Sequence, residues 1–183
     1  MKKNQTDAMK DLLYKMSKIS FASYIYRTEL LRSESISFDE DLKYGEDREF
    51  NWKYLANCNS CFCVEDTLYY YRLNNESATR KKSTWKNIDA LVSVDRTYHY
   101  LRERKCEFAD EYYRYMYARS MWHVAKNFAV SREKGLFKKL VNEYDVKSCM
   151  KVTKKDQSFL VRVASILFLI NPYLFYFFVG LKK

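Results

Sequence analysis

The chain has 183 residues, 48% of which are hydrophobic, and a formal net charge of +10. This length and hydrophobic content suit one folded domain with a tail and argue against disorder. With three glycines and one proline, the sequence lacks the turns of an all-β sandwich, and it contains no phosphate-cradling loop of the Walker or dinucleotide type.

The net positive charge comes entirely from the second part of the chain. Residues 1–80 carry 12 Lys/Arg and 13 Asp/Glu, whereas residues 81–183 carry 21 and 10. Such a basic half can bind nucleic acid or an anionic membrane, or form solvated helices. Five cysteines and a polar start indicate reduced thiols in the cytosol. The cysteine cluster at 58–63 lacks a fourth ligand at zinc-finger spacing, so no metal site is predicted there.

The first part of the chain is predicted to form short strands and helices. Aromatic and β-branched residues favour a strand over Ser20–Arg27, followed by a short helix. Residues 38–44 are predicted to form a loop. A helix is predicted from Glu46 to Asn57, because the acidic residues of its first turn complement the helix dipole. Two short strands follow, near Cys61–Val64 and Leu68–Leu73.

Beyond Ser77 the pattern becomes helical. Apolar residues recur at helical spacing in three stretches, which begin at Trp85, at Phe108 and at Leu136. Stripes of this kind indicate a hydrophobic core more often than a cofactor site. The second part of the chain is therefore predicted to be an α-helical extension.

The chain closes with an apolar segment that has two main interpretations. Val163–Leu181 is nineteen residues long, carries no charge, and is flanked by Arg162 and Lys182. This length is borderline for a bilayer span. Because Asn171-Pro172 interrupts the segment, two short apolar helices or a re-entrant hairpin at the membrane interface compete with one spanning helix. A buried core helix followed by a strand is the alternative that needs no membrane.

A carboxylate pair, Glu46-Asp47, follows Gly45 at the start of the predicted helix. The helix dipole and the free amide groups of a first turn favour a negative charge, so Asp47 is expected to be ionised and available as a base. Gly45 would let a ligand approach the backbone without meeting a Cβ atom. The alternative is that these acidic residues only stabilise the helix end.

The neighbouring motifs occur in a recognisable order between Met16 and Arg80. They are Tyr26-Arg27-Thr28-Glu29-Leu30-Leu31, Ile36-Ser37-Phe38-Asp39-Glu40, Gly45-Glu46-Asp47-Arg48-Glu49-Phe50 and Leu68-Tyr69-Tyr70-Tyr71-Arg72, followed by Ser77. This order resembles the acceptor-side half of bacterial family 2 glycosyltransferases, which have a GT-A fold. The resemblance implies that Asp47 is the catalytic base and that Glu46 orients the acceptor. It also implies that Arg72 and Ser77 bind the donor diphosphate and that Gly45 and Arg48 bind the acceptor.

The sequence departs from that family before Lys18. The nucleotide-binding half of the family, which ends in a metal-binding Asp-x-Asp motif, has no counterpart there. Asp39-Glu40-Asp41 also matches the pattern Asp-x-Asp, but it occurs later in the chain than the metal-binding motif of the family. It is interpreted as a solvated loop, with metal binding as the alternative. The Mn²⁺ or Mg²⁺ expected for the full-length family would thus find no ligands in this chain, and no metal-binding residue is assigned.

We therefore expect an α+β, helix-rich fold in three parts. Residues 1–80 would be an incomplete GT-A domain, residues 81–157 an α-helical extension, and residues 158–183 an apolar tail that associates with the membrane. The expected function is the inverting transfer of a sugar from a nucleotide sugar to a cell-surface polysaccharide or lipid-linked acceptor. The expected location is the cytoplasmic face of the cell membrane.

The sequence also bears on partners and on two other functional classes. The chain would be truncated and inactive alone, so a separate nucleotide-binding half is a further expected partner. The alternative function is a non-catalytic membrane-associated helical remnant, or one half of a split enzyme. Nucleic acid is not expected as a partner, because the aromatic residues that alternate with Lys/Arg from Tyr112 to Arg119 fall at core spacing and form no recognition motif.

Overall fold

The computed structural model describes residues 1–14, 23–64, 66, 68–70 and 83–181. The fold is α+β and rich in helix, as predicted. The elements in chain order are β1 (Lys2–Asn4), α1 (Gln5–Tyr14), α2 (Thr28–Ser33), α3 (Glu46–Asn57), β2 (Ser60–Phe62), the 3-10 helix η3 (Trp85–Ile88), α4 (Asp89–Glu103), α5 (Ala109–Val130), α6 (Lys134–Glu143), α7 (Val146–Thr153), α8 (Phe159–Ile170) and α9 (Pro172–Gly180).

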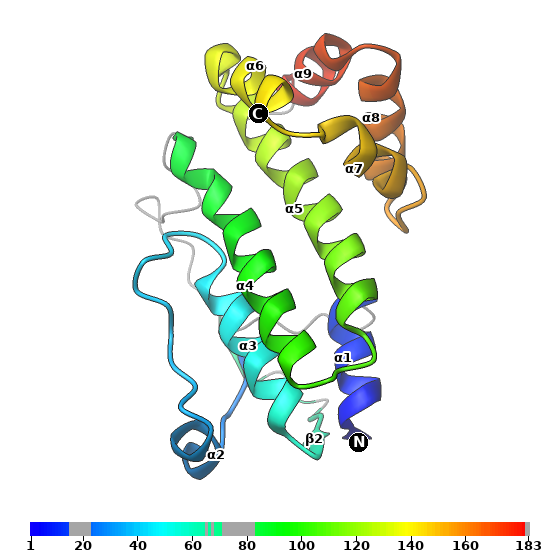
Figure 1. The fold of residues 1–183 in the computed structure, drawn as a ribbon. Coiled ribbons are helices and arrows are strands. Elements are labelled where there is room, and N and C mark those ends of the chain that lie inside the picture. Colours follow the sequence, from blue (N-terminus) through cyan, green and yellow to red (C-terminus); the bar gives the residue numbers. More distant parts are fainter. Residues whose placement is uncertain (15–22, 65, 67, 71–82, 182–183) are drawn as a thin grey trace.

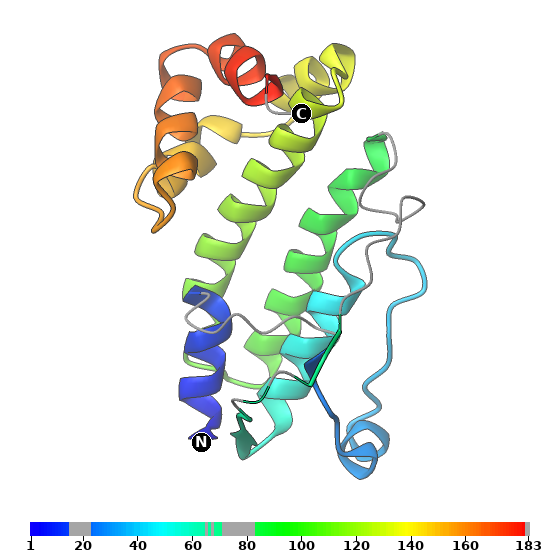
Figure 2. The ribbon, with the colours of Figure 1, turned by 180° about the vertical axis from the view of Figure 1, so that it is seen from behind.

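The long helices α4 and α5 form the centre of the molecule. They run antiparallel and are joined by a tight turn at residues 104–108, as Figures 1 and 2 show. Helices α1 and α3 lie beside the lower half of this pair, and α6 to α9 gather around the upper end of α5 (Figure 1). Neither α4 nor α5 contains glycine or proline, so both can run without a kink.

Two hydrophobic clusters hold these helices together, and α5 contributes to both. The lower cluster joins α1, α3, α4 and α5 through buried side chains that include Met9, Leu13, Trp52, Leu101 and Tyr112. The upper cluster joins the five helices α5, α6, α7, α8 and α9 through buried side chains that include Phe128, Phe137, Met150, Phe168 and Phe175. The helical stripes predicted from the sequence therefore face these two cores.

The only sheet in the described part of the chain pairs its start with a segment after α3. Strand β1 runs antiparallel to β2, with Lys3 opposite Cys61. The strand predicted near Cys61 is thus confirmed, but its partner was not foreseen. The strand predicted over Leu68–Leu73 is wrong for residues 68–70, which are irregular, and its remainder lies outside the described residues. The strand predicted over Ser20–Arg27 is also wrong for Tyr24–Arg27, which is irregular because Tyr26 packs its ring on α3 and pairs with no strand. Residues 20–22 of that prediction lie outside the described residues.

The apolar segment at the end of the chain forms two short helices. Asn171 has an extended backbone (φ −156°, ψ 124°), and its side chain accepts a hydrogen bond from the amide of Tyr173 at 2.8 Å. Pro172 occupies the first position of α9, where its missing N–H costs no hydrogen bond. The predicted break at Asn171-Pro172 is confirmed. Within the described residues, no helix combines the length and apolar character that crossing a bilayer requires.

A buried polar group fixes the turn between α7 and α8. Asp156, which is 4% exposed, accepts hydrogen bonds from the Arg119 guanidinium and, at 3.1 Å, from the hydroxyl of Tyr115. The amide of Ser158 also donates to its carboxylate, at 2.9 Å. Asp156 therefore connects the middle of α5 to the start of α8.

Candidate functional site

The candidate site is the first turn of α3, which begins at Glu46 as predicted. Gly45 precedes it in the left-handed region (φ 92°), a conformation that favours glycine. Three carboxylates, those of Glu46, Asp47 and Glu49, lie in this turn, near the positive end of the helix dipole. The turn thus concentrates negative charge where the backbone can stabilise it.

Gly45 is required by a neighbouring helix. A Cβ atom at this position would lie 2.8 Å from both Cβ and Oγ of Ser93 on α4. The Ser93 hydroxyl in turn donates a hydrogen bond of 2.7 Å to the carbonyl oxygen of Gly45. In the structure it is therefore Ser93 that lies close to the backbone of Gly45. An acceptor contact at Gly45 stays a prediction.

Gly45→Ala is expected to destabilise the fold by about 1–3 kcal/mol, because alanine would meet both backbone strain and the Ser93 side chain. Gly135→Ala is the matched control. Gly135 lies in the first turn of α6, and a Cβ atom there would meet nothing within 4 Å. Alanine at this position should stabilise the helix by about 0.5–1 kcal/mol. Urea denaturation of both variants measures the difference, and equal effects would contradict the assigned role of Gly45.

Arg48 holds α3 against both central helices. Its guanidinium donates to the Ser120 hydroxyl on α5 at 2.9 Å and to the Ala90 carbonyl oxygen on α4 at 2.6 Å. Each of these bonds carries the charge assistance of the guanidinium. The contacts that the structure shows for Arg48 are thus structural, and its predicted contact with an acceptor remains untested.

The two carboxylates of the pair lie in partly buried positions. Burial raises the pKa of the Glu46 carboxyl above its ordinary value, and the charge of the adjacent Asp47 raises it further. Asp47 accepts a hydrogen bond of 2.7 Å from the amide of Arg48. Asp47 also lies near Tyr26, whose pKa is raised mainly by burial and additionally by the charges of Tyr24 and Asp47. The charge of Asp47 is thus felt at the Tyr26 hydroxyl, whose hydrogen-bond partner is Asn51.

Four aromatic rings form a wall beside this turn. The ring of Tyr26 lies 5.1 Å from Phe50 and 5.0 Å from Tyr54, edge-on in both cases, and Phe38 stacks on Phe50 at 4.2 Å. The Tyr26 hydroxyl donates to the side-chain oxygen of Asn51. The sequence predicts the helix that carries Phe50 and Tyr54, but not the contacts that Tyr26 and Phe38 make with it. Aromatic surfaces with a few polar groups are typical linings of small-molecule sites.

The acidic loop before α3 is tied to α4. Arg96 forms an ion pair with Asp39, and this hydrogen bond holds the pKa of the Asp39 carboxyl below its ordinary value. The amide of Asp41 donates to the same carboxylate at 3.0 Å. Among the described residues no group of three or more His, Cys, Asp or Glu side chains is placed to hold a metal ion. Asp39 thus serves to fix the loop, and its contacts do not fit a cation site.

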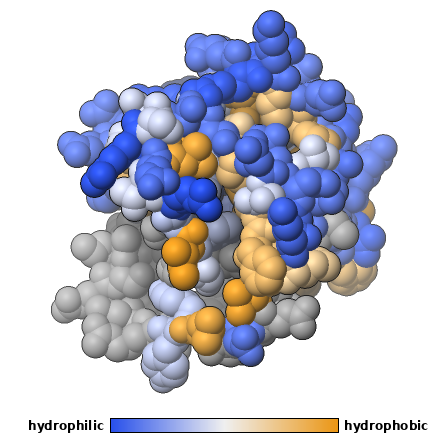
Figure 3. Space-filling view, turned by 90° about the horizontal axis from the view of Figure 1, so that it is seen from below, coloured by the Kyte–Doolittle hydropathy of each residue, from blue (hydrophilic) through white to orange (hydrophobic). Residues whose placement is uncertain are grey.

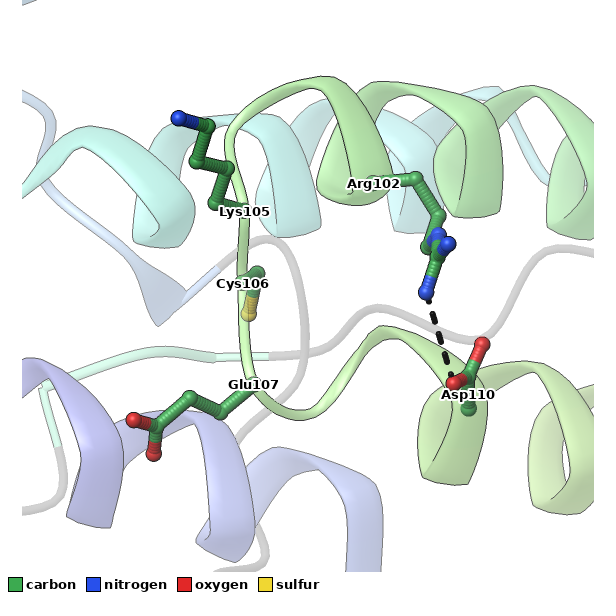
Figure 4. A pocket seen from close by; sticks show the side chains of 5 residues that line it. All are labelled: Arg102, Lys105, Cys106, Glu107 and Asp110. Atoms are coloured by element: carbon green, nitrogen blue, oxygen red, sulfur yellow. Dashed lines mark hydrogen bonds and ion pairs between the residues drawn. The ribbon is translucent and has the colours of Figure 1, made fainter.

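The remaining predicted site residues are not brought to this turn. Arg72 and Ser77 lie outside the described residues. A cavity of about 350 Å³ opens at the turn between α4 and α5, where Arg102 points towards Asp110 at 3.5 Å (Figure 4). It is lined by Arg102, Lys105, Cys106, Glu107 and Asp110. None of these side chains belongs to the candidate site.

Comparison with known proteins gives partial matches to two enzymes. The chain is 36% identical over 56 residues to an uncharacterized glycosyltransferase, EpsJ, of Bacillus subtilis. It is 42% identical over 52 residues to the poly(ribitol-phosphate) beta-N-acetylglucosaminyltransferase TarS of Staphylococcus aureus. The chain is similar to bacterial glycosyltransferases.

These matches cover short segments of all the proteins concerned. They span 31% and 28% of this chain, but 16% of EpsJ and 9% of TarS. No protein-family model and no solved structure matches the chain. The similarity therefore supports a glycosyltransferase relationship in general, while the donor, the acceptor and the stereochemistry of the relatives do not carry over.

Proposed function

We propose that this chain provides the acceptor side of an inverting glycosyltransferase, which transfers a sugar from a nucleotide sugar to a glycan or lipid-linked acceptor. The observation that carries the proposal is the start of α3, where the half-buried Glu46-Asp47 pair is followed on the same helix by Phe50 and Tyr54, against which Tyr26 and Phe38 pack. The partial similarity to two glycosyltransferases supports the same reaction class.

In the proposed reaction, Asp47 takes the proton of the attacking acceptor hydroxyl. A bond forms between that oxygen and the anomeric carbon, while the bond from the anomeric carbon to the nucleoside diphosphate breaks on the opposite face. The leaving diphosphate takes up the bonding electrons, and the configuration of the sugar is inverted. A positioned carboxylate base of this kind contributes about 10²–10⁴-fold to a rate. Glu46, beside Asp47, is proposed to orient the acceptor.

The donor side is assigned to residues beyond this turn. We propose that Arg72 and Ser77 approach the donor diphosphate, whose growing negative charge needs cationic or hydrogen-bonding partners. The described carboxylates do not fit a site for Mn²⁺ or Mg²⁺, because Asp39 is engaged with Arg96 and no other group of ligands assembles among the described residues. A cation used by the enzyme would be held by a nucleotide-binding portion.

An assay of nucleoside diphosphate release tests the proposal. The sample is a protein that joins this chain to a nucleotide-binding portion, and a sugar nucleotide of N-acetylglucosamine is the first donor, because one relative is named for that sugar. Release that depends on added glycan acceptor is the expected result. No release with any nucleotide sugar would favour the alternative, a non-catalytic membrane-associated remnant.

The chain alone is expected to show no saturable binding of nucleotide sugars in titration calorimetry, with or without Mn²⁺. The physical reason is that its described carboxylates form no cation site. In addition, the contacts to the nucleobase of the donor are assigned to a nucleotide-binding portion. Tight binding that depends on Mn²⁺ would show that this chain holds the donor by itself. It would contradict the division into donor and acceptor sides.

A further inference from the structure

Helices α8 and α9 are almost entirely apolar, with Arg162 as their one charged residue, although each buries one side only. In α8, the buried side chains are those of Val161, Ala164, Ser165 and Phe168, while the opposite side is exposed. In α9, Phe175 and Gly180 are buried against the upper core. A surface helix of a water-soluble protein is normally amphipathic and presents polar residues to the solvent. A helix that is hydrophobic on its outward side as well indicates a second apolar environment.

We call the exposed apolar side chains of the two helices, taken together, the apolar face. Its members are 37–70% exposed, and they are Phe159, Leu160, Val163, Ile166, Ile170, Tyr173, Leu174, Phe177, Phe178 and Leu181. These ten are more than half of the nineteen large hydrophobic side chains that are exposed in the described part of the chain. Seen from below, the coloured residues are mostly hydrophilic, with hydrophobic groups between them (Figure 3).

Cations border the apolar face. The Lys134 ammonium lies 5.9 Å from the ring of Tyr173, and the Arg162 guanidinium lies 5.8 Å from the ring of Phe159. Residues 131–181 carry nine Lys/Arg and four Asp/Glu, and the sequence continues with Lys182 and Lys183. Protein–protein interfaces are depleted of lysine, whereas aromatic rings with basic neighbours are typical of the boundary between water and an anionic bilayer.

We propose that the apolar face is a docking surface for an anionic lipid membrane, in which α8 and α9 lie in the plane of the interface. The two helices have 12 and 9 residues, which correspond to about 18 and 14 Å of length, too short for the roughly 30 Å of a hydrocarbon core. The cytoplasmic leaflet of the cell membrane carries the anionic lipids that this charge pattern fits. This inference goes beyond the proposed transfer reaction and does not depend on it.

Flotation of the full chain with lipid vesicles tests the proposal. We expect binding to vesicles that contain phosphatidylglycerol, weak binding to pure phosphatidylcholine, and a decrease at high salt. Ile170→Glu combined with Phe177→Glu should lower the partition coefficient by more than roughly tenfold. Lys134→Gln combined with Arg162→Gln should lower binding to anionic vesicles only.

The control variants make the same kinds of substitution at exposed positions outside the apolar face. Ile25→Glu with Leu68→Glu replaces two side chains that are 99% and 81% exposed, and Lys2→Gln with Lys43→Gln removes two charges outside the apolar face. Both control pairs should bind vesicles like the unchanged chain, and circular dichroism should show the same helix content for all variants. Equal losses in test and control pairs would overturn the proposal. So would a dimer in light scattering that only Ile170→Glu with Phe177→Glu dissociates, without any effect of lipid.

Discussion

Asp47→Asn is expected to reduce the rate of glycosyl transfer by about 10²–10⁴-fold, because asparagine cannot take the proton of the acceptor hydroxyl. The fold should be unaffected, since asparagine keeps the side-chain oxygen that accepts from the amide of Arg48. The measurement is nucleoside diphosphate release by the protein that joins this chain to a nucleotide-binding portion. The loss should appear mainly in kcat, because the proton is transferred in the transition state.

Two matched variants show whether the effect belongs to Asp47. Asp41→Asn removes an exposed carboxylate from the preceding loop and should leave the rate within a factor of about two, as is usual for surface substitutions. Glu46→Gln should reduce the rate less than Asp47→Asn, since Glu46 is proposed to orient the acceptor. An unchanged rate in Asp47→Asn would remove the assignment of the base.

Asp156→Ala is expected to destabilise the protein by about 3–5 kcal/mol, because it leaves the buried Arg119 guanidinium without its counter-charge. The side chains of Arg119 and Asp156 are only 11% and 2% exposed, so water cannot replace the lost carboxylate. For a domain of this size, the loss corresponds to a decrease in Tm of roughly 6–20 °C. Differential scanning calorimetry of the full chain measures it.

Glu143→Ala is the control for that loss. Glu143 also forms an ion pair, with Lys139 at 3.8 Å, but the two side chains are 50% and 47% exposed. Pairs of this kind contribute about 0–1 kcal/mol, so Tm should change little. Similar decreases for both variants would show that the buried position of Asp156 is not what matters.

Local features of the fold were predictable from the sequence. Helix α3 begins at Glu46 and ends at Asn57 as predicted, because Gly45 and the acidic first turn mark its start within a few residues. The break at Asn171-Pro172 was predictable for the same reason, since proline acts on its immediate neighbours. Signals that act within one turn of the backbone can be read without knowing the fold.

Contacts between distant residues were not predictable. Strand β1 pairs with a segment about 58 residues later, and Arg48 finds its partner Ser120 at a separation of 72 residues. No local pattern marks either pair. The candidate site has the same limit: the Glu46-Asp47 pair was found from its helix start, whereas the contacts that bring Tyr26 and Phe38 to Phe50 depend on the tertiary fold.

The length and straightness of helix α5 affect how the molecule would be placed on a membrane. Its 22 residues form an uninterrupted rod of about 33 Å, with α9 packed against it at Trp122 and Ala129 and Arg48 bound at Ser120 near its midpoint. Ser120 lies ten residues before Val130, about 15 Å along the axis. Because no glycine or proline lets the rod bend, placing α8 and α9 among the lipid headgroups would also fix the position of Arg48, and of Asp47 beside it, relative to the bilayer.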